Sequence, residues 1–211
     1  MGSGAKRKAR EKAVKKRLAK ERHFAKMKRG VPPGFIAKYA DPNSLAVCGP
    51  VLKAIWTVPM ALAKALTDSS RPIPAPLPGY MLIDTGAAGT CIALDAAQEL
   101  GLTPLRLEKS YGAGGLHELP VFGVQLTIII VDSMGREVSM GGDLQVKGIP
   151  ELGDYFRNVP VQFADAAFPR RMVGLIGRDL LRHATFVYKG SIGQFDFKLD
   201  LGSLTQRIPG T

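Results

Sequence analysis

The chain has 211 residues, and its 29 Lys and Arg side chains against 18 Asp and Glu give a formal net charge of +11. Residues 1–30 hold 13 of the basic residues and only two acidic ones, so the rest of the chain is neutral overall. The length suits one domain with a sizeable core, and two cysteines exclude a disulfide scaffold or a cysteine-rich zinc site.

The N-terminal segment differs in composition from the rest. Residues 6–29 are rich in Ala, Lys, Arg and Glu with few apolar positions, which predicts a basic tail that is disordered, or helical against an acidic surface. The sequence Val31-Pro32-Pro33-Gly34 follows and cannot continue a helix. We therefore expect a tail and linker at residues 1–34 and one folded domain at residues 35–211.

The folded part alternates short apolar stretches with turn residues, which is typical of an all-β domain with short helices. The four prolines in 71–79 predict an extended loop, Gly101 the end of a helix, and Asp132-Ser133-Met134-Gly135 a hairpin turn. Strands are predicted at 51–58, 80–83, 121–131, 137–145, 159–163, 173–176, 185–188 and 194–199, and helices at 59–66, 94–100 and 179–183.

Signals for targeting are missing from the sequence. No apolar run approaches the roughly 18 residues of a membrane-spanning helix. The N-terminus has no apolar signal-peptide segment, and Lys6 stands where the myristoylation motif needs Ser or Thr. We expect a cytoplasmic protein without a transmembrane segment.

The most informative motif reads Leu82-Ile83-Asp84-Thr85-Gly86-Ala87. A carboxylate directly after an apolar strand is costly to bury unless it has partners. Gly86 allows the backbone to turn tightly beside it, and Thr85 supplies a hydroxyl. Taken alone, Asp-Thr-Gly is equally compatible with an ordinary turn.

Two further segments follow in a defined order. The first is glycine-rich and reads Ser110-Tyr111-Gly112-Ala113-Gly114-Gly115-Leu116, and the second reads Gly174-Leu175-Ile176-Gly177-Arg178-Asp179-Leu180-Leu181. The glycine-rich segment suits a mobile hairpin, because glycine tolerates positive φ and close backbone approach. It is also compatible with an ordinary glycine hairpin. A phosphate-binding loop is disfavoured, because no Lys-Ser/Thr pair follows.

This order of motifs resembles the retropepsin-like aspartic proteases, and the chain end resembles their bacterial and cellular members more than the viral ones. The resemblance covers about residues 49–199. It implies a closed β-barrel or sandwich with one lobe per chain. It also implies Asp84 as the catalytic residue, an active-site loop of Thr85, Gly86 and Ala87, a substrate-binding flap, and structural support of the site. The flap would comprise Tyr111, Gly112, Ala113, Gly114 and Gly115, and the support Ile176, Gly177 and Arg178.

The chain carries one Asp-Thr-Gly, whereas the implied chemistry needs two carboxyl groups around one water. The second Asp84 must then come from a second copy, so we expect a homodimer acting on a peptide or protein substrate. Two carboxyl groups this close share one proton, and one acts as base while the other acts as acid. Neither a metal nor another cofactor is required.

One position departs from the family pattern. In viral relatives the arginine that corresponds to Arg178 pairs with an aspartate directly after the motif's alanine, and here that position is Ala88. Arg178 is therefore expected to meet Asp179, Asp95 or a backbone carbonyl, or to serve the dimer in another way.

Other chemistries are less well supported. His117-Glu118 begins like a zinc HExxH motif, but Val121 replaces the second histidine, and the three histidines are scattered. Cys91 is expected to be a small core residue. The basic tail, residues 1–30, is a solvated extension, a nonspecific ligand of nucleic acid or another anionic surface, or a propeptide-like segment that the protease removes itself. The alternative function is therefore a catalytically inactive dimeric binding module that uses this tail.

Overall fold

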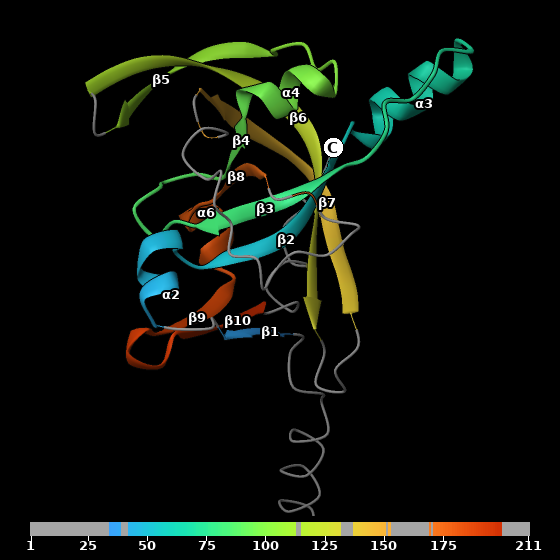
Figure 1. Cartoon of the computed structure of the whole chain (residues 1–211). Helices are drawn as coiled ribbons and strands as arrows, with labels where there is room; N and C mark the ends of the chain where they lie inside the picture. The colour runs from blue at the N-terminus through green and yellow to red at the C-terminus, as the bar shows by residue number, and fades with distance from the viewer. Residues whose placement is uncertain are drawn as a thin grey trace, which may run out of the picture.

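The computed structural model describes residues 34–38, 42–112, 115–131, 137–150, 152, 169 and 171–199. Strands dominate this part of the chain, and its helices are short (Figure 1), so the all-β prediction is confirmed. The basic tail and the predicted strand at 159–163 lie outside the described residues. The strands are β1 (Gly34–Lys38), β2 (Val51–Thr57), β3 (Leu77–Ile83), β4 (Cys91–Ala93), β5 (Arg106–Gly112), β6 (Gly115–Val131), β7 (Glu137–Ile149), β8 (Met172–Ile176), β9 (Ala184–Lys189) and β10 (Gln194–Leu199).

Short helical segments connect these strands. None of the helices among the described residues is long and apolar enough to span a membrane. They are α2 (Pro42–Cys48), α3 (Met60–Asp68), α4 (Leu94–Glu99), α6 (Arg178–Leu181) and the 3-10 turn η2 (Gly190–Ile192).

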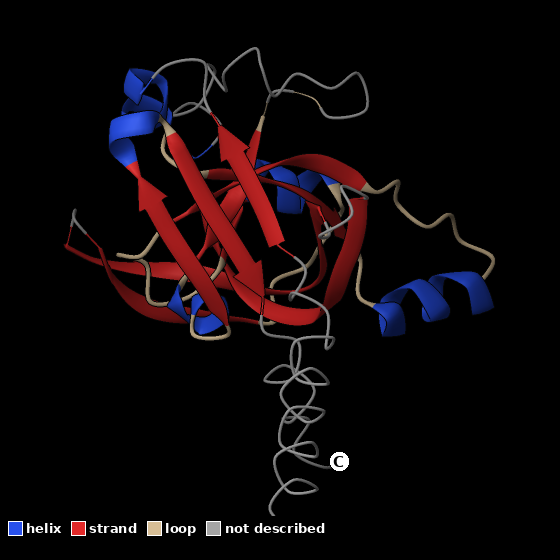
Figure 2. Ribbon diagram, turned by 90° about the horizontal axis from the view of Figure 1, so that it is seen from below, coloured by secondary structure: helices blue, strands red, loops and turns tan. Residues whose placement is uncertain are grey.

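Six strands close a barrel. Their order is β2-β3-β8-β4-β7-β6, and β6 pairs back to β2 to complete the ring. β8 lies between β3 and β4, parallel to the first and antiparallel to the second. β5 continues the sheet beyond β6, and β1, β10 and β9 form a separate sheet, whose strands lie side by side when the molecule is viewed from below (Figure 2).

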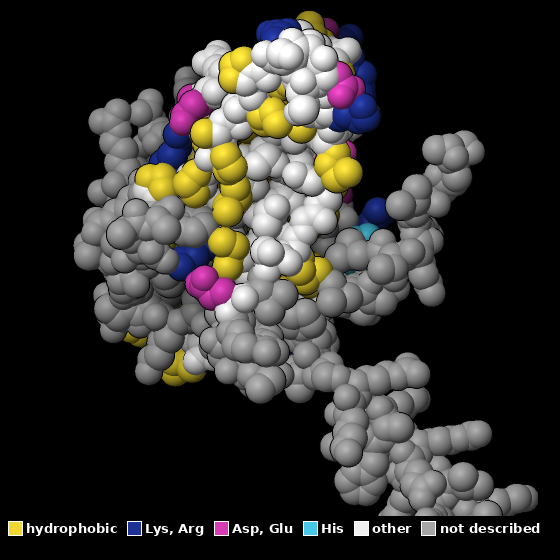
Figure 3. Space-filling model, turned by 90° about the vertical axis from the view of Figure 1, so that its right-hand side faces the viewer, with side chains coloured by type: hydrophobic (Ala, Val, Ile, Leu, Met, Phe, Trp, Pro, Cys, Tyr) yellow, Lys and Arg dark blue, Asp and Glu magenta, His cyan; other side chains and the backbone are white. Residues whose placement is uncertain are grey.

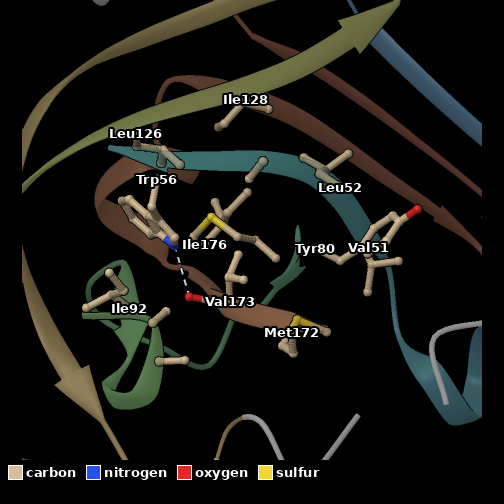
Figure 4. Packing of buried hydrophobic residues seen from close by; sticks show 14 of the residues in the cluster. Val51, Leu52, Trp56, Tyr80, Ile92, Leu126, Ile128, Met172, Val173 and Ile176 are labelled. Carbon is tan, nitrogen blue, oxygen red and sulfur yellow. Dashed lines mark hydrogen bonds between the residues drawn. The ribbon is translucent and has the colours of Figure 1, made fainter. Parts of the chain in front are cut away.

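Apolar side chains fill the barrel interior. Alternate residues of β2 are buried, as expected for a strand with one face toward a core. Trp56 is fully buried, and its Nε1–H donates to the Val173 carbonyl at 2.9 Å (Figure 4), so its one polar group is satisfied. Each large apolar side chain buried here contributes about 1.5–3 kcal/mol to stability.

Most predicted elements are confirmed within a few residues. The strand at 51–58, the helix at 94–100 and the pair 121–131 with 137–145 correspond to β2, α4 and the antiparallel β6–β7 ladder, although β7 runs on to Ile149. Gly101 follows α4 with a φ of 63°. The turn at 132–135 lies outside the described residues.

The predicted loop at 71–79 is wrong at its end, because Leu77, Pro78 and Gly79 belong to β3. At Pro78 this strand pairs with β2 alone, since its pairing with β8 begins at Tyr80. Proline is tolerated where a strand has a neighbour on one side only. Pro78 therefore marks a part of β3 at the edge of the sheet, and not a loop.

Helix α3 protrudes from the barrel (Figures 1 and 2). Leu66 is its one buried residue, whereas Met60 and Leu62 on the helix and Ile73 after it are exposed. Figure 3 shows this face of the molecule, with hydrophobic side chains in its middle and charged ones around its edge. The helix lies at the end of β2 and β3 opposite to Asp84, so it does not contribute to the site described next.

Candidate active site

Asp84 directly follows β3 and is held by the turn that it begins. Its backbone N–H donates to the Ile176 carbonyl of β8 at 3.0 Å. Its Oδ1 accepts hydrogen bonds from the backbone N–H groups of Gly86 at 2.8 Å and Ala87 at 3.2 Å. A Cβ at Gly86 would lie 3.1 Å from the same Oδ1, which is closer than most such contacts. The turn therefore orients a half-buried carboxylate through one of its oxygens.

β8 and α6 support this turn from one side. Gly177 packs so closely that a Cβ would lie 2.3 Å from the Gly89 carbonyl carbon, so only glycine fits without displacing the backbone. The Arg178 N–H donates to the Ala87 carbonyl at 3.0 Å. Ile176 itself is fully buried in the core.

The structure decides among the partners that we considered for Arg178. Its Nη1 donates to the backbone carbonyls of Thr85 at 3.1 Å and Gly86 at 3.3 Å. Asp95 instead contacts Arg171 at 3.5 Å. Within the chain, Arg178 thus binds the Asp-Thr-Gly backbone directly, and an acidic residue at position 88 is not needed for that contact.

A second clamp, which the sequence analysis missed, joins α6 to the end of the loop. Asp179 Oδ1 accepts from the Thr90 hydroxyl at 2.8 Å and the Thr90 N–H at 2.9 Å. The Thr90 hydroxyl oxygen in turn accepts from the Gly177 N–H at 3.2 Å. Thr90 is 3% exposed and is the one buried polar residue among those described. No local pattern distinguishes this threonine from any other that follows a glycine.

The glycine-rich segment forms the end of a hairpin made by β5 and β6. The strands pair from Arg106 with Val121 to Gly112 with Gly115, and Gly115 has a φ of 103°, which favours glycine. Tyr111 is 85% exposed. Ala113 and Gly114 lie outside the described residues.

A cleft of about 720 Å³ brings these segments together. Its lining includes Asp84, Gly86 and Ala87 from the turn, Tyr111 and Gly112 from the hairpin, and Arg178 from α6. It is not lined by Thr85, which is exposed, nor by Gly115, Ile176 or Gly177. Segments almost a hundred residues apart therefore share one cavity, of a size typical of ligand sites.

Charged residues at the base of the hairpin also line the cleft, and the sequence analysis missed them. Arg106 donates to Glu108 at 2.7 Å, and Lys147 of β7 lies 3.6 Å from the same carboxylate. The hydrogen bond from Arg106, aided by the charges of both cations, holds the pKa of Glu108 below its ordinary value. The available signal was the alternation of Arg106, Glu108 and Ser110, which places all three on one face of a strand.

No three His, Cys, Asp or Glu side chains cluster as metal ligands would among the residues that the structure describes. His117 and Glu118 are neighbours on β6, so their side chains point to opposite faces of the strand. An HExxH motif needs a helix that places two histidines on one face, whereas His117 lies on a strand and residue 121 is valine.

Cys91, the first residue of β4, is buried and still lines the cleft wall. Burial, followed by the charge of Asp179, raises the pKa of its thiol to about 11. Because the thiolate is the reactive form, we expect Cys91 to alkylate roughly two orders of magnitude more slowly at neutral pH than an exposed thiol. Iodoacetamide labelling followed by peptide mass spectrometry measures this rate, which should rise as the pH approaches 11. Rapid labelling at neutral pH would show that the thiol is activated.

No protein-family model matches the chain, and no curated protein matches its sequence.

Proposed function

We propose that this chain is the subunit of a homodimeric, retropepsin-like aspartic endopeptidase in which Asp84 is the catalytic residue. The observation that carries the proposal is the single cleft lined by the Asp84 turn, the β5–β6 hairpin and Arg178. These are the three segments whose order in the sequence resembles that family.

The arrangement of strands supports the same proposal. β3 and β4 are consecutive strands in the chain but are separated in the sheet by β8, whose Ile176 carbonyl accepts from the Asp84 N–H. Such a crossing holds the turn rigid from below while leaving its carboxylate open to the cleft. A closed barrel with a carboxylate-bearing turn at one end is what the resemblance implies for one lobe of such an enzyme.

In the proposed mechanism, two subunits place their Asp84 carboxyl groups around one water. The two groups share one proton. The ionised carboxylate takes a proton from the water, whose oxygen attacks the scissile carbonyl carbon while the protonated carboxyl group donates to the developing oxyanion. Collapse of the tetrahedral intermediate breaks the C–N bond, and the leaving amine takes up a proton. The products are a carboxylic acid and an amine, without a covalent intermediate.

The remaining motif residues have supporting roles in this proposal. Thr85, exposed in the single chain, would hydrogen-bond to its counterpart across the twofold axis. Gly86 and Ala87 would bind the substrate backbone. The hairpin end from Tyr111 to Gly115 would close over the bound peptide and exclude water.

Incubation of the purified full chain with a peptide library, at pH values from acidic to neutral, tests the proposal. We expect internal peptide bonds to be cleaved best at mildly acidic pH, where one carboxyl of the pair holds a proton. A statine-type inhibitor, which mimics the tetrahedral intermediate, should stop this cleavage. Absence of cleavage at every pH would contradict the proposal.

A further inference from the structure

We infer that Lys147, at the base of the β5–β6 hairpin, makes the cleft selective for peptides whose glutamate or aspartate side chain binds there. The inference rests on the proposed endopeptidase function and names its substrate class. Lys147 would be a specificity-determining residue that contacts the substrate side chain.

The position of Lys147 follows from strand pairing. It lies on β7, opposite Cys91 of β4 on one side and Val121 of β6 on the other. Its ammonium reaches toward β5, with Nζ at 3.5 Å from the Ser110 hydroxyl and 3.6 Å from a Glu108 oxygen. Because Cys91 belongs to the strand that follows the Asp84 turn, Lys147 links the catalytic end of the cleft to the base of the hairpin.

The charges around Lys147 do not cancel. Glu108 is one carboxylate beside two cations. Arg106 lies closer to it, at 2.7 Å, than Lys147, at 3.6 Å. Arg106 also donates to the Gln145 side chain at 2.7 Å, so its guanidinium already has two hydrogen-bond partners. The hydrogen bond from Arg106 and the nearby Lys147 ammonium favour the ionised form of the Glu108 carboxylate, whose pKa lies below its ordinary value. The group therefore has a net charge of +1 toward the cleft.

Of these three residues, Lys147 is the one whose N–H donors can bind a substrate carboxylate. An ammonium has three N–H donors, and charge-assisted hydrogen bonds are typically about 2.7–2.9 Å long. Both contacts of Lys147 are longer than that, and its side chain keeps 32% of its exposure. A substrate carboxylate could approach closer than either present partner.

Three more charged residues line the cleft, and each has partners of its own. Asp84 accepts from the N–H groups of its own turn, Arg178 donates to backbone carbonyls, and Asp179 accepts from Thr90. The apolar side chains of Leu119 and Ile149 line the same cleft, so a bound side chain is partly removed from water, which strengthens an ion pair. A lysine or arginine in the substrate would instead meet Arg106 and Lys147 together.

The experiment takes one peptide that the full chain cleaves and sets each position from P4 to P4′ to Glu, Gln or Lys in turn. We expect kcat/KM at one position to favour Glu over Gln by about tenfold at low salt, with Lys poorer than Gln. In Lys147→Met, which keeps the apolar stem, this Glu/Gln ratio should fall to about one.

Lys64→Met is the matched control, because it removes one positive charge from the exposed helix α3, outside the cleft. It should keep the Glu/Gln ratio, so that a loss of the preference in Lys147→Met cannot be ascribed to the change in net charge alone. Cleavage without a preference for Glu at any position, or a preference that persists in Lys147→Met, would overturn the inference and leave the endopeptidase proposal intact. Failure to cleave any peptide would refute the endopeptidase proposal itself, and the inference with it.

Discussion

Replacing Asp84 with asparagine is expected to lower peptide cleavage by roughly 10³-fold or more, because an amide can neither take the proton from water nor return it. The fold should be unaffected. The asparagine Oδ1 can still accept from the N–H groups of Gly86 and Ala87, which are the bonds that hold the turn. Initial rates on a cleaved peptide and thermal unfolding, both on the full chain, measure the two effects.

Asp143→Asn provides the matched control for this substitution, since Asp143 is an exposed residue of β7 that does not line the cleft. It should retain wild-type activity. Full activity in Asp84→Asn would refute the catalytic role of Asp84. Co-refolding equal amounts of wild-type and Asp84→Asn chains adds a test of the dimer. If every site needs two aspartates, activity should fall to about one quarter, whereas independent subunits would retain about one half.

Gly177→Ala is expected to have the largest effect on stability, lowering the free energy of unfolding by about 3 kcal/mol. The new Cβ would lie 2.3 Å from the Gly89 carbonyl carbon, 2.4 Å from its oxygen and 2.8 Å from the Thr90 nitrogen. These are backbone atoms, and the hydrogen bonds from Thr90 to Asp179 hold them in place. The contact can therefore be relieved only by moving the turn, so activity should fall as well.

Urea denaturation at equal protein concentrations measures this loss, because the stability of the proposed dimer would depend on concentration. Gly142→Ala is the control, since Gly142 also lies in a strand but a Cβ there would meet no atom within 4 Å. It should change stability by no more than about 0.5 kcal/mol. Equal effects of the two substitutions would show that the loss does not come from close packing beneath the Asp84 turn.

Most of the fold prediction rested on the alternation of apolar and polar residues and on turn residues. It was incomplete at strands whose sequences show neither pattern clearly. The glycine-rich hairpin was expected but β5 was given no bounds, because it pairs with β6 alone and is largely exposed, so its sequence Arg-Leu-Glu-Lys-Ser-Tyr-Gly has no apolar face for a core. β4 has only three residues, too few to show a period. The start of β3 was missed because proline usually marks a loop.

The sequence by itself determined the local features of the site. An aspartate after an apolar strand, a glycine that permits the turn and a glycine-rich hairpin end can all be recognised within a few residues. Only the tertiary structure decided which distant groups meet: Arg178 with the Thr85 carbonyl, Thr90 with Asp179, and Lys147 with Glu108. The physical reason is that residue periodicity specifies the face on which a side chain lies, whereas its partner depends on strand order and register. Closure of the barrel between β2 and β6 sets both.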